Sequence, residues 1–108
     1  MTAEALEFVQ VAPVDDCSSG QRLFIEVDEN QIVVFNLAGN FYAIADVCTH
    51  DDGPLGDGPL IGYEIECPRH GARFDIRTGK VTRMPAVTPI QWFPVIIEGD
   101  EIQVEISE

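Results

Sequence analysis

Two short stretches, Cys48-Thr49-His50 and Cys67-Pro68-Arg69-His70, decide how the rest of this chain of 108 residues is interpreted. Each stretch supplies one thiolate and one imidazole, and a loop-like run from Asp51 to Glu66 separates them. Common structural zinc sites instead pair a C-x-x-C knuckle with two histidines or with a second knuckle. We therefore interpret four residues as the ligands of one metal centre: Cys48, His50, Cys67 and His70.

Two kinds of centre suit two sulfur and two nitrogen ligands. One is a tetrahedral zinc ion. The other is a two-iron, two-sulfur cluster in which one iron takes both cysteines and the other takes both histidines. The ligand types alone leave both centres open.

The residues after the second stretch, Gly71 to Asp75 and Arg77 to Lys80, complete a pattern that closely resembles the Rieske cluster-binding motif. This resemblance implies one [2Fe–2S] Rieske-type cluster as the cofactor. It also implies that Cys48 and Cys67 bind a buried iron, and that His50 and His70 bind an outer iron through their Nδ1 atoms. The outer iron then takes the electron, and the imidazole edges lie at the surface where partners dock. By the same resemblance, Met84 and Pro85 belong to a loop that covers the other side of the cluster.

High-potential Rieske proteins of respiratory complexes differ from this chain at four positions. They carry an extra cysteine in each ligand loop, forming a disulfide, where this chain has Gly53 and Arg69. They also place a serine and a tyrosine as donors to sulfur, where this chain has Ala72 and Phe74. Fewer donors to the sulfur atoms predict a lower potential within the Rieske range of about −150 to about +300 mV.

Together with its size, these departures make the chain resemble the ferredoxin component of bacterial aromatic-ring-hydroxylating dioxygenase systems. The resemblance implies a one-electron carrier rather than an enzyme. The expected partners are an NAD(P)H-dependent flavoprotein ferredoxin reductase and a terminal Rieske oxygenase in aromatic hydrocarbon catabolism. Oxygen activation on non-haem iron would need a separate site with two histidines, and the only two histidines are already assigned.

Two alternatives stay open from the sequence. One is an accessory Rieske subunit of another redox system, such as nitrite reduction or iron–sulfur assembly. The other is a structural zinc module that binds proteins, which would be colourless and redox-silent.

The charge of the chain restricts its partners. Acidic residues outnumber basic ones by 19 to 6, which gives a formal net charge of −13. We expect no binding to nucleic acid or to an anionic membrane, because phosphate contacts require lysine and arginine. Five basic residues lie within or after the second ligand stretch, and they form either a solvated surface or a docking face for redox partners: Arg69, Arg73, Arg77, Lys80 and Arg83.

The three cysteines indicate in which cellular compartment the protein works. If Cys48 and Cys67 are ligands, Cys17 has no partner within the chain, so no disulfide framework is available. We interpret Cys17 as a small apolar filler. Together with the absence of an apolar run long enough to span a membrane, this predicts a cytoplasmic protein.

Short β-prone runs separated by turn residues predict an all-β fold, a Rieske-type antiparallel β-sandwich or barrel with a small inserted cluster-binding subdomain. We expect one domain over 1–108, with a base of 1–45 and 76–108 and a cluster-binding part of 46–75. The predicted strands are 6–12, 23–27, 32–35, 41–45, 63–66, 72–76, 81–82, 92–97 and 102–106, with no helix of normal length. Strand aromatics are expected in the core: Phe24, Phe35, Phe41, Trp92 and Phe93.

Overall fold

The computed structural model describes residues 7–49, 53–84, 86 and 88–106. It confirms the all-β prediction, because every strand pairing in it is antiparallel. The strands are β1 (Glu7–Pro13), β2 (Arg22–Val27), β3 (Asn30–Leu37), β4 (Asn40–Ala45), β5 (Leu60–Ile61), β6 (Glu64–Glu66), β7 (Arg73–Asp75), β8 (Val81–Arg83), β9 (Trp92–Phe93), β10 (Val95–Glu98) and β11 (Glu101–Ile106). Within the described ranges, the only helical segment is the single 3₁₀ turn Val14–Asp16, and no helix is long and apolar enough to cross a membrane.

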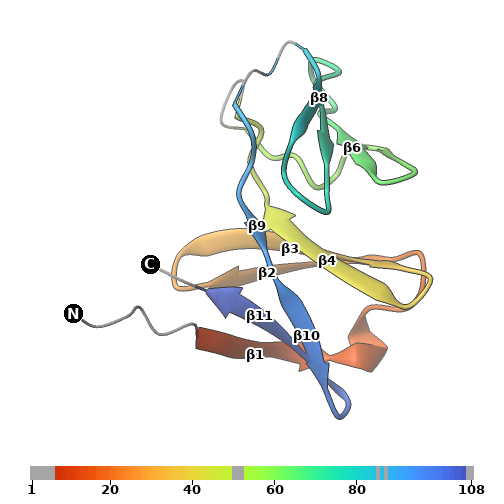
Figure 1. Cartoon of the computed structure of the whole chain (residues 1–108), viewed down its shortest axis with the longest axis vertical. Helices are drawn as coiled ribbons and strands as arrows, with labels where there is room; N and C mark the ends of the chain where they lie inside the picture. Colours follow the sequence, from red (N-terminus) through yellow and green to blue (C-terminus); the bar gives the residue numbers. More distant parts are fainter. Residues whose placement is uncertain (1–6, 50–52, 85, 87, 107–108) are drawn as a thin grey trace.

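The strands form three small sheets arranged in layers (Figure 1). The first has the order β1-β11-β10, the second β2-β3-β4-β9 and the third β5-β6-β7-β8. The third sheet lies at one end of the molecule, and the second sheet separates it from the first. The region between β4 and β8, which contains both ligand stretches, therefore projects from a base made of the other two sheets.

Strand β3 has a buried side chain on both faces, because it lies between two cores. Val33 and Phe35 face the core shared with the third sheet, whereas Ile32 and Val34 face the core shared with β11. Successive side chains of a strand point to opposite faces, so a continuous apolar run serves both cores at once. Cys48 and Cys67 belong to the first of these cores.

The predicted strand at 92–97 is wrong as a single element, because it divides at Pro94. Ala43 and Ile44 of β4 pair with Phe93 and Trp92 in β9, whereas β10 pairs with β11 in the other sheet. Proline lacks the backbone N–H that a continuing ladder would need. The carbonyl of Pro94 instead accepts a hydrogen bond of 2.9 Å from the amide of Glu105.

Two of the five aromatic residues that the sequence predicts in the core are exposed instead. Phe35 and Phe93 are buried and Phe41 is half-buried, but Phe24 and Trp92 are each 46% exposed. The physical reason is the strand order: Phe24 lies on β2 and Trp92 on β9, the two edge strands of their sheet. The short strand β5 was also not predicted, and Leu6 lies outside the described residues.

Candidate metal centre

The first ligand loop follows directly from β4. Cys48 is fully buried, and its amide donates a hydrogen bond of 2.8 Å to the carbonyl of Gly53, so the chain folds back within five residues. Further along, Oδ1 of Asp46 accepts hydrogen bonds from the amides of Leu55 (2.9 Å) and Gly56 (2.6 Å). One carboxylate at the end of β4 thereby fixes the backbone of the glycine- and proline-rich segment.

Arg22 holds the same segment from the base. Its Nη1 atom donates to the carbonyls of Gly56 (2.5 Å) and Gly58 (2.8 Å), and its guanidinium lies 5.2 Å from the centre of the Phe35 ring. Arg22 is the one basic residue of the chain that precedes both ligand stretches. Its role depends on β2 lying next to the loop, which sequence spacing does not reveal.

The second ligand loop is a tight turn after β6. Cys67, which is 1% exposed, donates its amide to the carbonyl of Ala72 (2.7 Å), and its own carbonyl accepts from the amide of Gly71 (3.0 Å). Gly71 closes the turn with φ +80°, a conformation that glycine adopts without a steric penalty. The turn leaves Pro68, Arg69 and His70 exposed.

The two ligand loops are joined at several points. The amide of Glu66 donates to the carbonyl of Pro59 (3.0 Å), and Nη1 of Arg69 donates to the carbonyl of Pro54 (2.7 Å). A third segment is attached to the first loop, because Oγ1 of Thr49 donates to the carbonyl of Thr88 (2.6 Å). Met84 in this segment is 75% exposed, whereas Pro85 lies outside the described residues.

The four predicted ligands occupy different environments. Cys48 and Cys67 are buried in one core cluster, on two adjoining loops, and His70 is exposed; His50 lies outside the described residues. Within the described ranges, which leave out His50, no group of three or more His, Cys, Asp or Glu side chains is placed to hold a metal ion. A two-iron cluster needs only two protein ligands at each iron. The donor types and the contrast in burial thus fit such a cluster with a buried thiolate end and an exposed imidazole end.

Ala72 and Phe74 are both fully buried in the core cluster that contains the two cysteines. Neither side chain carries a hydroxyl group that could donate to sulfur. The lower reduction potential predicted from these two residues stays a prediction. It rests on the presence of apolar side chains at both positions.

Most of the basic residues proposed for a docking face make contacts within the molecule. Arg73 pairs with Glu66 (3.0 Å) and Glu64 (3.5 Å), and Arg77 pairs with Asp75 (2.8 Å). The hydrogen bonds from Arg77 lower the pKa of the Asp75 carboxyl, and the same pairing raises the pKa of Arg77. Lys80 and Arg83 are exposed, so the docking-face hypothesis is best tested at these two positions.

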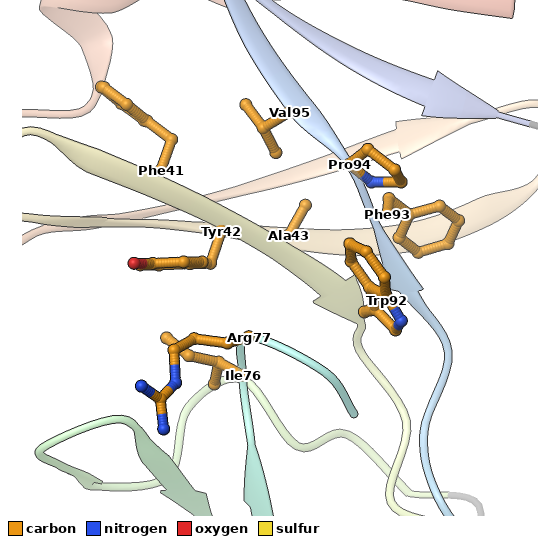
Figure 2. Close-up of a pocket in the computed structure, with 9 residues that line it drawn as sticks. All are labelled: Phe41, Tyr42, Ala43, Ile76, Arg77, Trp92, Phe93, Pro94 and Val95. Atoms are coloured by element: carbon orange, nitrogen blue, oxygen red, sulfur yellow. The ribbon is translucent and has the colours of Figure 1, made fainter. Parts of the chain in front are cut away.

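A separate cavity of about 270 Å³ lies where β4, β9 and the segment after β7 meet (Figure 2). Tyr42 and Arg77 lie on facing sides of it, with Trp92 at one end. The guanidinium of Arg77 stacks 4.0 Å from the centre of the Tyr63 ring, which meets Tyr42 edge to face at 6.0 Å. The cavity includes none of the predicted ligands. No sequence pattern predicts it, because its lining comes from segments far apart in the chain.

Comparison with known proteins shows the family to which this chain belongs. The family model for the Rieske [2Fe-2S] domain matches residues 7–94. The ferredoxin component of the p-cumate 2,3-dioxygenase system of Pseudomonas putida is 36% identical over 98% of this chain and 92% of its own length.

Two solved structures show the same fold. The ferredoxin of carbazole 1,9a-dioxygenase from Nocardioides aromaticivorans IC177 is 36% identical, with a TM-score of 0.84 over 90% of this chain and 95% of that one. A ferredoxin-sized chain in a complex of reduced oxygenase and oxidized ferredoxin in carbazole 1,9a-dioxygenase is 31% identical, with a TM-score of 0.82 over 91% and 92% of the two chains. The cofactor is therefore one Rieske-type cluster rather than zinc, and the role is electron transfer rather than oxygenation. This chain belongs to the Rieske [2Fe–2S] family and is an electron-carrying ferredoxin of that family.

Proposed function

We propose that this ferredoxin carries single electrons from an NAD(P)H-dependent flavoprotein reductase to a terminal Rieske oxygenase that hydroxylates aromatic rings. The observation that carries this proposal is similarity over nearly the full length to ferredoxins named as components of dioxygenase systems. One of the similar structures is a complex of reduced oxygenase and oxidized ferredoxin in carbazole 1,9a-dioxygenase. A ferredoxin component of such a system needs an electron donor, and we infer that this donor is a flavoprotein reductase.

We also propose that Cys48 and Cys67 bind the inner iron of the cluster and that His50 and His70 bind the outer iron. The burial of both cysteines and the exposure of His70 support this division. When bound, the cluster supplies a site that accepts and releases one electron without a bond to substrate. The chain excludes water from the thiolate end through the surrounding core and presents the exposed turn 68–70 to a partner.

The segment 46–75 is proposed as the cluster-binding part, with 1–45 and 76–108 as its base, in one domain over 1–108. Strand β8 (Val81–Arg83) pairs with β7, so the third sheet extends beyond the proposed boundary at residue 75. The contacts of Arg22 support this division, because they hold the first ligand loop on the edge of the base, whereas Asp46 fixes the same loop from within the cluster-binding part. We place the protein in the cytoplasm, where a reducing environment suits thiolate ligands. The net charge of −13 favours protein partners with basic faces over nucleic acid or membranes.

Electron paramagnetic resonance of the dithionite-reduced protein, with iron, sulfide and zinc quantified on the same sample, tests the ligand assignment. We expect an anisotropic spectrum with equal iron and sulfide. His70→Ala and His50→Cys should each abolish this native signal, and a normal spectrum in either variant would refute the assignment.

Reconstitution tests the partners. The reduced protein, mixed with a purified reductase and oxygenase of an aromatic dioxygenase system encoded near its gene, should support NADH-dependent oxygen consumption with substrate. Support of a nitrite reductase instead, with no transfer to any oxygenase, would favour the role of an accessory redox subunit.

A further inference from the structure

The side chain of Arg69 extends from the second ligand loop onto the first. Arg69 is the neighbour of His70 in the turn that begins at Cys67, and its Nη1 atom donates a hydrogen bond of 2.7 Å to the carbonyl of Pro54. This hydrogen bond joins two loops that are separated by 15 residues in sequence. It is charge-assisted on the donor side, which makes it stronger than a hydrogen bond between neutral groups.

Gly53 provides the space that this contact needs. A methyl group on Gly53 would lie 2.7 Å from both Cζ and Nη2 of Arg69 and 3.1 Å from Nε. The planar guanidinium therefore lies directly against the Cα of Gly53. The φ angle of Gly53 is not in the left-handed region, so it is the close approach of Arg69 and not the backbone conformation that favours glycine here.

The contact of Arg69 with the first ligand loop lies close to the predicted ligand Cys48, because a single backbone hydrogen bond connects the two. The carbonyl of Gly53 accepts the amide of Cys48 (2.8 Å), and Pro54, which accepts from Arg69, is the next residue. A displacement of 53–54 would therefore be transmitted to the backbone of Cys48. A displacement of Arg69 would be transmitted to His70, its neighbour in sequence.

We propose that Arg69 and Gly53 form a non-covalent clamp that fixes the two ligand loops relative to each other and so slows the loss of the cluster. Arg69 acts as a positioning residue, because its side chain contacts the opposite loop through Gly53 and Pro54. The clamp rests on the proposed ligand loops but not on the identity of any redox partner. The wild-type spectrum tests those loops independently of the clamp.

Four variants separate the clamp from the charge of Arg69. Arg69→Gln removes both the charge and the guanidinium group, whereas Arg69→Lys keeps the charge. Gly53→Ala keeps the whole arginine but places a methyl group where the guanidinium lies. Lys80→Gln is the matched control, because it removes one positive charge at an exposed position between β7 and β8, in neither ligand loop.

The measured quantity is the rate at which the visible absorbance of the cluster decays in the presence of an iron chelator. Arg69→Gln should increase this rate about tenfold, which corresponds to about 1.4 kcal/mol at 25 °C. Gly53→Ala should give an increase of the same order, Arg69→Lys a smaller one and Lys80→Gln none. Both Arg69→Gln and Gly53→Ala should also broaden the paramagnetic resonance lines of the reduced cluster, because the ligand loops then sample more than one arrangement.

The double variant Gly53→Ala/Arg69→Gln provides the decisive comparison. Residues that act through one contact have non-additive effects, so the double variant should lose its cluster no faster than Arg69→Gln alone. The clamp would be overturned if the increase in decay rate in the double variant equalled the product of the two single increases. It would also be overturned if Arg69→Gln and Lys80→Gln lost their clusters at the same rate. Urea unfolding of each variant serves to distinguish loop displacement from global destabilisation: a drop in unfolding midpoint that fully accounts for the faster decay would also overturn the proposal.

Discussion

The Cα of Gly58 lies against the backbone carbonyl of Glu66, so closely that a methyl group on Gly58 would be 1.8 Å from that oxygen. Gly58 belongs to the first ligand loop, and Glu66 directly precedes Cys67 in the second. The two loops therefore meet backbone to backbone, where no side chain can move aside. Glycine is required at this position by the approach of another chain segment.

Gly58→Ala is expected to separate the two loops. Overpacking costs about 1–3 kcal/mol where neighbours can adjust, and backbone adjusts least. We expect a loss of unfolding free energy at the upper end of that range and a markedly lower iron content after purification. The measurements are urea unfolding and iron analysis.

Gly62→Ala is the control for this variant. Gly62 has a φ of +63°, but a methyl group there would meet nothing within 4 Å. This variant should cost about 1–2 kcal/mol through backbone strain and retain its iron. Equal iron loss in both variants would contradict the role assigned to the contact between Gly58 and Glu66.

Arg22→Met should loosen the first ligand loop from the base. The variant keeps an apolar stem over Phe35 but loses the donors to the carbonyls of Gly56 and Gly58. Hydrogen bonds from charged groups contribute about 1.5–3 kcal/mol, so we expect a decrease of about 2 kcal/mol in unfolding free energy. Chemical unfolding measures it, and Arg22→Lys should lose less; an Arg22→Met protein as stable as wild type would contradict this role.

Cys17 is expected to be inert and unnecessary for the cluster. It is fully buried, its Sγ lies 3.6 Å from the carbonyl oxygen of Gln21 and 3.8 Å from that of Val34, and burial raises the pKa of its thiol. Since a raised pKa means less thiolate near neutral pH, alkylation of the native protein at pH 8 should leave Cys17 unmodified. Mass spectrometry after iodoacetamide treatment checks this result.

The variant Cys17→Ala tests whether Cys17 takes part in binding the cluster. The variant should retain the iron and sulfide content and the resonance spectrum of the wild type, with a loss of about 1 kcal/mol from the small cavity. Loss of the spectrum in this variant would show that the assignment of the two cysteine ligands is wrong.

Asp75→Asn should lower stability in a pH-dependent way. Nε and Nη2 of Arg77 donate to the two oxygens of Asp75 at 3.0 and 2.8 Å, and these hydrogen bonds lower the pKa of Asp75. A carboxyl whose pKa is lower in the folded state stabilises the fold above its unfolded pKa of about 3.9, and this stabilisation is lost as the pH falls through the folded pKa. Wild type should therefore be more stable than Asp75→Asn at pH 7, with the difference shrinking below about pH 4. Urea midpoints across this range measure it, and a difference independent of pH would argue against the ion pair as its source.

Much of the fold followed from local patterns in the sequence. The predicted strands at 23–27, 32–35, 41–45 and 102–106 lie within β2, β3, β4 and β11, and short turns join the first three into two hairpins. These features were predictable because period-two alternation and turn chemistry depend on neighbouring residues only. The Rieske pattern likewise identified the family and its cofactor, which similarity to known ferredoxins confirms. The four ligand positions remain predictions.

The arrangement around the ligand loops could not be predicted in the same way. The exposure of Phe24 and Trp92 depends on which strands lie at the sheet edges, and apolar character alone does not reveal strand order. The division of 92–97 depends on the sheet with which each half pairs.

The sequence by itself determined an all-β chain with two cysteine–histidine stretches, because ligand types, turns and alternation are local properties. Only the tertiary structure decided what holds those stretches together. Arg22 reaches the carbonyls of Gly56 and Gly58, and Arg69 reaches that of Pro54, across 15 to 36 residues of sequence. Such contacts arise when packing of the two cores brings distant backbone within hydrogen-bonding distance, and no local pattern encodes that distance.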